Sequence, residues 1–270
     1  MASFDNLIMD SALRVSAFDL ENKSLLLMMT QPTDATLNAT SESTEVSGLK
    51  GLAIASLDRS KGCTFEMTNG LFVTNAFAAQ VGADVVEASS SAPIIVPYIE
   101  TIKLDVTENS GSVTAVSATL SHEPADADVQ VYKMTSAGGQ GERLEMIAEG
   151  SASAGQFSVD GATVTFNVAD FVAGDSVVVV YNFKANSGIK ITNDSESYTK
   201  NVRIVVDIIA RDVCTDKIYH TVLEMPRAKL DGNFSLAMGT EAATHPLSAV
   251  ALPNLCSADK TLFNWYIVED

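Results

Sequence analysis

Apolar and polar residues alternate along most of the chain, which is the pattern of half-buried β-strands. The clearest example covers residues 156–169, where two alternating segments flank Asp160-Gly161. Asp-Gly between such segments predicts a β-hairpin with a type I′ turn, because that turn needs positive φ at both central residues. The β-branched run at residues 176–183 predicts a central strand buried on both faces. The pattern as a whole indicates an all-β protein.

The alternation continues towards the C-terminus. Within residues 202–213, every even position from Val202 to Ala210 is apolar and predicts a core face. A second strand is predicted at residues 218–225. A third is predicted from Arg227 to Met238, because apolar and polar positions keep their parity through Gly232, where another backbone approaches or the strand bends. Its apolar parity is assigned to the core: Ala228, Leu230, Phe234 and Leu236.

A single helix is predicted from Gly70 to Val81, with Thr68 or Asn69 as its N-cap and Gly82 as its end. Apolar residues at helical spacing form one stripe, and the opposite side is mostly small. We expect this stripe to pack on the flank of a sheet. Its members are Phe72, Val73, Ala76, Phe77 and Val81, of which the four larger residues Phe72, Val73, Phe77 and Val81 are the helix-packing candidates.

Two other segments suggest how the chain is organised. Residues 31–50 are rich in Thr and Ser with few apolar residues, which predicts a long polar loop of the kind that is functional or disordered. Residues 99–185 contain enough short strands for a small β-sandwich of their own. We therefore expect a fold formed by residues 1–98 plus 186–270, with 99–185 as an inserted or peripheral β module. The alternative is one large sandwich.

The net charge of −17 is spread along the chain, and no cluster of Lys and Arg suggests a nucleic-acid reader. The charge favours solubility, or a surface that lies beside DNA without binding it. No apolar run is long enough to cross a membrane, and residues 1–18 lack the apolar stretch of a signal peptide. We expect synthesis in the cytoplasm. An odd number of cysteines predicts buried, reduced thiols at Cys63, Cys214 and Cys256.

No residues are assigned to catalysis, a cofactor or a metal. Gly138, Gly139 and Gly141 stand between predicted strands, so a hairpin turn explains them better than a phosphate loop. His220 is expected to be half-buried in a strand and His245 to lie in a loop. A glycosidase carboxylate pair is not excluded by counting, but the chain has a single Trp where carbohydrate sites usually need aromatic platforms.

Short phrases in the second half carry a family resemblance: residues 190–194, 202–207, 212–214, 226–236 and 262–266. The first half agrees more loosely, with residues 61–70 followed by a single helix that ends at Gln80-Val81-Gly82. In this order the phrases resemble the major tail tube proteins of long-tailed, siphovirus-like bacteriophages. Residues 99–185 match the family least.

The resemblance implies a tail-tube-type β-sandwich with one flanking α-helix, whose inner sheets join into a β-barrel in a hexameric ring. Stacked rings would form a virion tail tube around a DNA conduit, with other tail proteins at its ends and no specific DNA binding. It implies a structural protein without enzymatic activity, cofactor or membrane partner, made in the host cytoplasm. A capsid decoration protein and a hydrolase on a β scaffold are the alternatives.

Within that framework, three sets of residues receive expected roles. The polar parity of the predicted strand 227–238 supplies lumen candidates, although the same face could be an ordinary solvated surface. Arg227 and Lys229 are expected to pair with acidic residues across a subunit boundary. The lumen candidates are Asp231, Asn233 and Ser235. The candidates for contact between subunits, all in the predicted loop, are Asp34, Asn38, Glu42 and Glu45.

Overall fold

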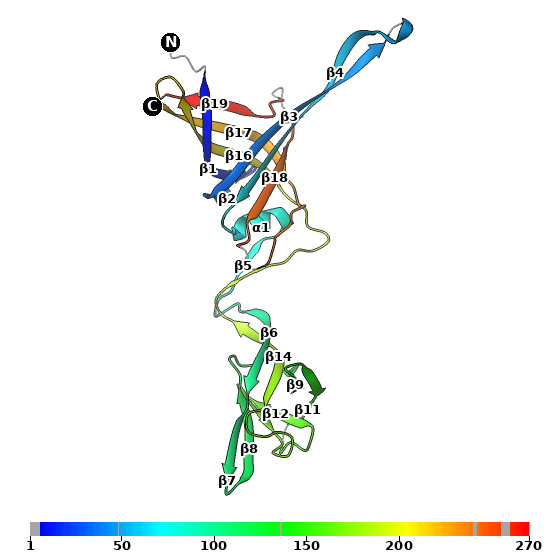
Figure 1. Ribbon diagram of the computed structural model, residues 1–270, viewed down its shortest axis with the longest axis vertical. Helices are drawn as coiled ribbons and strands as arrows, with labels where there is room; N and C mark the ends of the chain where they lie inside the picture. Colours follow the sequence, from blue (N-terminus) through cyan, green and yellow to red (C-terminus); the bar gives the residue numbers. More distant parts are fainter. Residues whose placement is uncertain are drawn as a thin grey trace. The chain divides into compact units, whose positions relative to one another are not determined.

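The computed structural model describes residues 6–47, 49–135, 137–148, 150–239, 242–254 and 260–269. These residues form a mostly β structure with one short α-helix and several sheets, nearly all of whose strand pairs are antiparallel (Figure 1). The expectation of a β protein with a single helix is confirmed. The chain divides into two compact units, Met1–Val85 with Ile191–Asp270 (unit 1) and Val86–Lys190 (unit 2).

Unit 1 is built on an eight-stranded sheet in the order β2-β1-β16-β17-β18-β4-β3, with β19 paired to β17. Its strands are β1 (Leu7–Asp19), β2 (Leu25–Met29), β3 (Pro32–Ser47), β4 (Ala53–Asn69), β16 (Asn201–Asp212), β17 (Ile218–Leu230), β18 (His245–Ala251) and β19 (Asn264–Val268). The helix α1 (Thr74–Val81) and a 3₁₀ turn at Leu49–Gly51 complete the unit. The sheet does not close into a barrel, since β2 and β3 remain at its ends.

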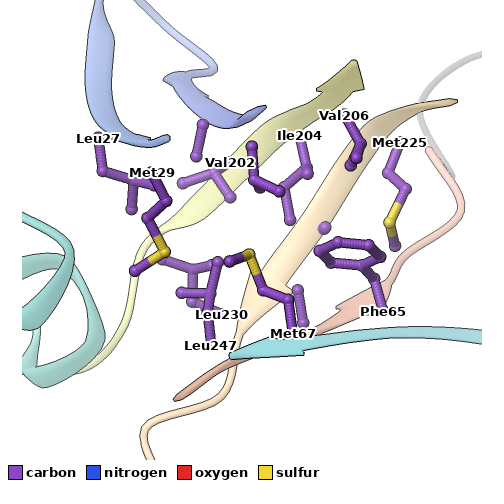
Figure 2. Packing of buried hydrophobic residues seen from close by; sticks show 14 of the residues in the cluster. Leu27, Met29, Phe65, Met67, Val202, Ile204, Val206, Met225, Leu230 and Leu247 are labelled. Carbon is purple, nitrogen blue, oxygen red and sulfur yellow. The ribbon is translucent and has the colours of Figure 1, made fainter. Parts of the chain in front are cut away.

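The core of unit 1 lies on one face of this sheet (Figure 2). On β16 the predicted alternation is confirmed: Val202, Ile204 and Val206 are completely buried. Side chains from β2, β4, β17 and β18 meet them, including Met29 and Phe65. Each aliphatic or aromatic side chain buried in this way contributes about 1.5–3 kcal/mol, so this face holds the unit together.

Strand β17 differs from its prediction at both ends of the Arg227–Met238 segment. The strands predicted at residues 218–225 and from Arg227 onwards are a single strand that continues through Pro226. The register against β16 shifts at this point and leaves Pro226 in a β-bulge, where a residue without a backbone N–H loses no hydrogen bond to the neighbouring strand. The strand then ends at Leu230, so the prediction of a strand up to Met238 is wrong. Ala228 and Leu230 are buried as expected, whereas Phe234 and Leu236 lie beyond the strand and are only half-buried.

The strand ends because the Asp231 side chain competes for the backbone. Asp231 Oδ1 accepts the backbone N–H of Asn233 at 2.9 Å, which forms a local turn. The backbone N–H of Asp231 still reaches Ser248 O in β18, at 2.9 Å. Gly232 is therefore not inside a strand as predicted, although the backbone of α1 does lie against it: an added Cβ would be 3.4 Å from the carbonyl oxygen of Gln80, an ordinary van der Waals contact.

The helix begins at Thr74, not at Gly70, and Val73 occupies its N-cap position without a side-chain bond. The N-cap prediction was wrong because Asn69 ends β4, where its buried side chain accepts Gln31 N–H at 3.0 Å and donates to Leu71 O at 2.6 Å. The predicted end is confirmed. Gly82 has the left-handed φ of 72° that a C-terminal glycine supplies.

The predicted loop at residues 31–50 is wrong. Residues 32–47 form β3, which pairs with β4 along its whole length and makes a long hairpin (Figure 1). Both faces of the hairpin are exposed from Ser41 to Lys61 in the described residues, and we call this part the arm. Apolar and polar residues alternate along a strand only when one of its faces is buried. Because both faces of the arm are exposed, its sequence lacks the alternation from which a strand could have been predicted.

Unit 2 contains a four-stranded sheet, β10-β9-β14-β6, and a five-stranded sheet, β11-β12-β13-β8-β7, that enclose a core of their own. The strands are β6 (Ile94–Lys103), β7 (Asp105–Asn109), β8 (Ser112–Thr119), β9 (Gln130–Met134), β10 (Gln140–Arg143), β11 (Glu145–Met146), β12 (Gln156–Asp160), β13 (Thr163–Phe166) and β14 (Ser176–Ala185). The pairing of β9 with β10 confirms the hairpin turn for Gly138 and Gly139, whereas Gly141 lies within β10.

Two predictions for unit 2 need correction in detail. The β12–β13 hairpin is confirmed, but Asp160 pairs with Thr163, so the turn residues are Gly161 and Ala162. Of these two only Gly161 has positive φ, at 55°, as in a type II′ turn. Strand β14 is central as predicted, but only one of its faces is fully buried.

The two connections between the units run side by side. Strand β5 (Val85–Glu87) pairs with β15 (Ile189–Ile191), and the backbone N–H of Ala88 donates to Gly188 O at 2.9 Å. The chain therefore leaves unit 1 and returns to it at neighbouring points.

Candidate assembly surfaces

The sheet of unit 1 has unpaired edges. Strand β3 lies at one end of the strand order and is hydrogen-bonded to no described strand on its outer side, although β1 comes within 8 Å of it between Cα atoms. At the other end, β2 pairs only with Val15–Phe18 of β1, so residues 7–13 of β1 lack a described partner on that side. Unpaired strand edges are templates for pairing with another chain. These edges are therefore candidate contacts between subunits.

The arm presents apolar side chains that nothing in the described chain covers. Leu49 is 94% exposed at its end, and Leu52 and Ile54 are 71% and 72% exposed. Val46 and Leu57 are also exposed. Exposed apolar clusters of this kind mark interaction sites. Lys50 stands among them with φ of 71°, so the tip combines apolar side chains with one cation.

The four residues expected to contact a neighbouring subunit lie along β3. All four side chains are exposed: Asp34, Asn38, Glu42 and Glu45. Asp34 is near the base of the hairpin, whereas Glu42 and Glu45 belong to the arm, where Glu42 Oε2 accepts Ser60 Oγ–H at 3.0 Å. The structure places them on a strand edge instead of in a loop, and their contact with another subunit stays a prediction.

A cleft opens between β1 and β3 on the core side of the sheet, and we call it the β1–β3 cleft. Its volume is about 340 Å³. Phe65, Val206 and Leu223 belong to the buried core at its floor, and Trp265 of β19, which is 37% exposed, lines it as well. Two exposed carboxylates, Asp10 and Asp34, also line it. The cleft therefore combines an apolar interior with negative charge.

The lumen candidates occupy a turn instead of a strand face. Asp231, Asn233 and Ser235 follow the end of β17, beside α1 and β18. They were chosen because they would share the polar face of one strand, and no strand continues to these residues. Their role in lining the lumen therefore stays a prediction without that support. Of their expected neighbours, Lys229 is exposed, and Arg227 is half-buried with no described partner for its Nε.

The face of the sheet opposite the core carries ion pairs that run across strands. Arg14 of β1 donates from Nε to Asp207 of β16 at 2.7 Å, and Arg203 of β16 donates to Glu224 of β17 at 2.6 Å. Burial would raise the pKa of Glu224, but hydrogen bonds from Tyr266, Arg203 and Asn264 lower it below its usual value. The two arginines are thus neutralised within the subunit. Sequence reasoning missed these pairs because they depend on register.

Helix α1 is fixed to the sheet by a polar contact that sequence reasoning also missed. His245, expected in a loop, begins β18 and is 1% exposed. Its Nδ1 accepts the backbone N–H of Val73 at 3.2 Å, so Nε2 carries the proton and donates to Gln80 Oε1 at 2.7 Å. Gln80 Nε2 donates in turn to Pro246 O at 2.9 Å. Burial lowers the pKa of His245.

The four predicted helix-packing residues are buried to different degrees. Val81 is buried, and Val73 and Phe77 are half-buried, with the Phe77 ring 5.5 Å from that of Phe234. Phe72 lies before the helix, is 46% exposed and stacks on His245 at 5.1 Å. Ala76, the fifth member of the predicted stripe, is completely buried as expected, and Ala78, which was not part of the stripe, is buried as well.

The cysteines and His220 agree only in part with expectation. Cys63 is buried, and burial raises the pKa of its thiol. Cys214 is exposed, so its predicted burial is wrong, and Cys256 lies outside the described residues. His220 is also exposed, contrary to expectation, because it points away from the core face of β17.

The described part of the chain contains no cluster of three or more His, Cys, Asp or Glu side chains arranged to hold a metal. Within the same residues, no helix has the length and apolar character needed to cross a bilayer.

The chain matches a known protein family. Residues 7–263 fit the model of the family described as YomU/Tube protein family. No curated protein matches the sequence.

Proposed function

The chain belongs to the YomU/Tube protein family, a phage tail tube protein family, and we propose that it is the subunit that forms the wall of a tail tube. Membership makes it a structural protein of the phage tail, in a family that is not enzymatic. The finer proposal is that six copies close into a ring, that rings stack, and that the stack surrounds the channel through which DNA passes.

The family match over nearly the whole chain carries this proposal. The outer edge of β3 along the arm supports it, because this edge has no described partner strand and joining edges around a ring removes the exposed strand edges that a single subunit leaves open. The exposed apolar tip of the arm gives a second contact, which would join neighbouring subunits.

The proposed channel is compatible with the charge of the protein. The net charge of −17 disfavours binding to DNA, which carries one negative charge per ~1.7 Å of duplex. The paired arginines on the sheet face opposite the core would offer DNA little free positive charge. We also propose that unit 2, with 12 acidic and 4 basic residues between 99 and 185, lies away from the channel.

Negative-stain electron microscopy of the purified protein tests the assembly. Rings or tubes with a central channel are expected. A uniform monomer over a wide concentration range would contradict the proposal. A capsid decoration protein, the alternative from another class of virion protein, would stay unassembled alone and bind a capsid lattice.

The lumen proposal needs its own test, which must leave the Asp231 turn intact. Asn233→Lys and Ser235→Lys keep the Asp231 carboxylate that closes the turn. If these residues face the channel, tubes should form but DNA ejection should slow, because charge acts strongly within about 10 Å at 0.1 M salt. Normal ejection through assembled tubes would show that another surface lines the channel.

A further inference from the structure

The arm tip and the β1–β3 cleft have complementary chemistry. The tip carries Leu49, Leu52 and Ile54, all more than two-thirds exposed, around the cation Lys50. The cleft has an apolar interior and two carboxylates, Asp10 and Asp34. Its volume of about 340 Å³ falls in the range of ~300–1,000 Å³ typical of binding pockets. The apolar side chains of the tip match the apolar interior of the cleft, and the charge of Lys50 is opposite to that of the two carboxylates.

The arm cannot place its tip in the cleft of its own subunit. The cleft and the tip lie at opposite ends of β3: the first residues of β3 line the cleft, and the tip follows its last residue. At about 3.3 Å per residue, the 16 residues of β3 span roughly 50 Å. The strand is paired with β4 from Pro32 to Ser47, with three register shifts along the way, so the tip stays at the far end of the hairpin from the cleft. An occupant of the cleft that comes from an arm must therefore come from another copy.

The occupant would enter with its side chains and not as an added strand. The Cα atoms of β1 and β3 approach each other within 8 Å. A strand inserted between two others needs two spacings of about 4.8 Å, which is wider than this approach. Apolar side chains need only the space between the strands, where the exposed lining residues Met9 and Trp265 would contact them.

From these observations we infer that the β1–β3 cleft of one subunit receives the arm tip of a second copy, with Lys50 held between Asp10 and Asp34. This inference rests on the proposed function and names the receiving site for the arm. Donor and acceptor surfaces differ, so the contact is head-to-tail and repeats from copy to copy.

Charge reversal tests the pairing. Lys50→Glu should raise the protein concentration needed for assembly by about tenfold or more, because like charges at an interface cost several kcal/mol. Combining Lys50→Glu with Asp10→Lys and Asp34→Lys should restore assembly. The control is Lys23→Glu, which changes an exposed lysine that also has positive φ, at 58°, in the β1–β2 turn. It should assemble normally.

A cross-link gives a second readout. In a background with Cys214→Ser and Cys256→Ser, the pair Leu52→Cys and Ala12→Cys should form disulfides between subunits when tubes are oxidised. Normal assembly of Lys50→Glu, or failed rescue together with absent cross-links, would overturn the inference. Wild-type tubes in the same experiment would keep the proposed function intact, and their absence would count against that function instead.

Discussion

His245 shows how one buried residue can make the subunit sensitive to pH. Its ring is neutral and fully hydrogen-bonded between α1 and β18, and burial lowers its pKa below the usual 6.5. The unfolded chain therefore binds a proton more readily than the folded one. The stability that this site provides is complete above pH 6.5 and is lost as the pH falls below that value.

We expect the free energy of unfolding to fall as the pH decreases from 7.5 to 5.5, by up to ~1.4 kcal/mol per pH unit from this group. His245→Asn should cost about 1–3 kcal/mol at pH 7.5, because Gln80 and Val73 lose a partner. The same variant should flatten the pH dependence. Urea denaturation at several pH values measures both effects. His220→Asn, at an exposed position, should keep the wild-type slope, and an unchanged slope in His245→Asn would refute the assignment.

At the scale of elements, sequence reasoning succeeded where one face of a strand is buried. The alternation in β16 and in the β12–β13 hairpin identified the core-facing side chains correctly. It failed where a strand is exposed on both faces and where a side-chain hydrogen bond ends a strand. The arm is exposed on both faces, so its strands have no period. The end of β17 depends on a side-chain turn at Asp231, which parity cannot detect.

The candidate surfaces were predictable only in part for the same reason. The sequence indicated that residues 31–50 matter, but their exposed apolar tip and the cleft beside β1 require the pairing of β3 with β4. The ion pairs Arg14–Asp207 and Arg203–Glu224 require the register of β1, β16 and β17, which joins residues far apart in sequence.

Shortening the arm tests the element as a whole. Ser41 pairs with Lys61, so replacing residues 42–60 with Asn-Gly would close the hairpin at that point with a favoured turn. The core residues Cys63, Phe65 and Met67 remain in place. We expect a folded, monomeric protein with a melting temperature near that of the wild type and no tubes under electron microscopy. Tubes of normal appearance would show that the arm makes no necessary contact.

At the scale of the molecule, the paired connections between the units allow a deletion. Because Ala88 and Gly188 are hydrogen-bonded neighbours, a short glycine-rich turn can replace residues 89–187 without moving the ends it joins. Unit 1 keeps its own core, and we expect it to fold and to assemble. Circular dichroism and electron microscopy check both. A variant that folds but does not assemble would place unit 2 in the assembly contacts.

The length of β3 also fixes a distance. If tip and base both touch neighbouring subunits, the paired hairpin holds those two contacts at most roughly 50 Å apart, and the number of residues in β3 then sets a spacing in the assembly. Adding two residues to each strand of the arm preserves which side chains face which way, and it should change the spacing between successive subunits along the arm by at most ~7 Å. Image reconstruction of the tubes would measure that increment, and an unchanged spacing would show that the hairpin does not serve as a ruler.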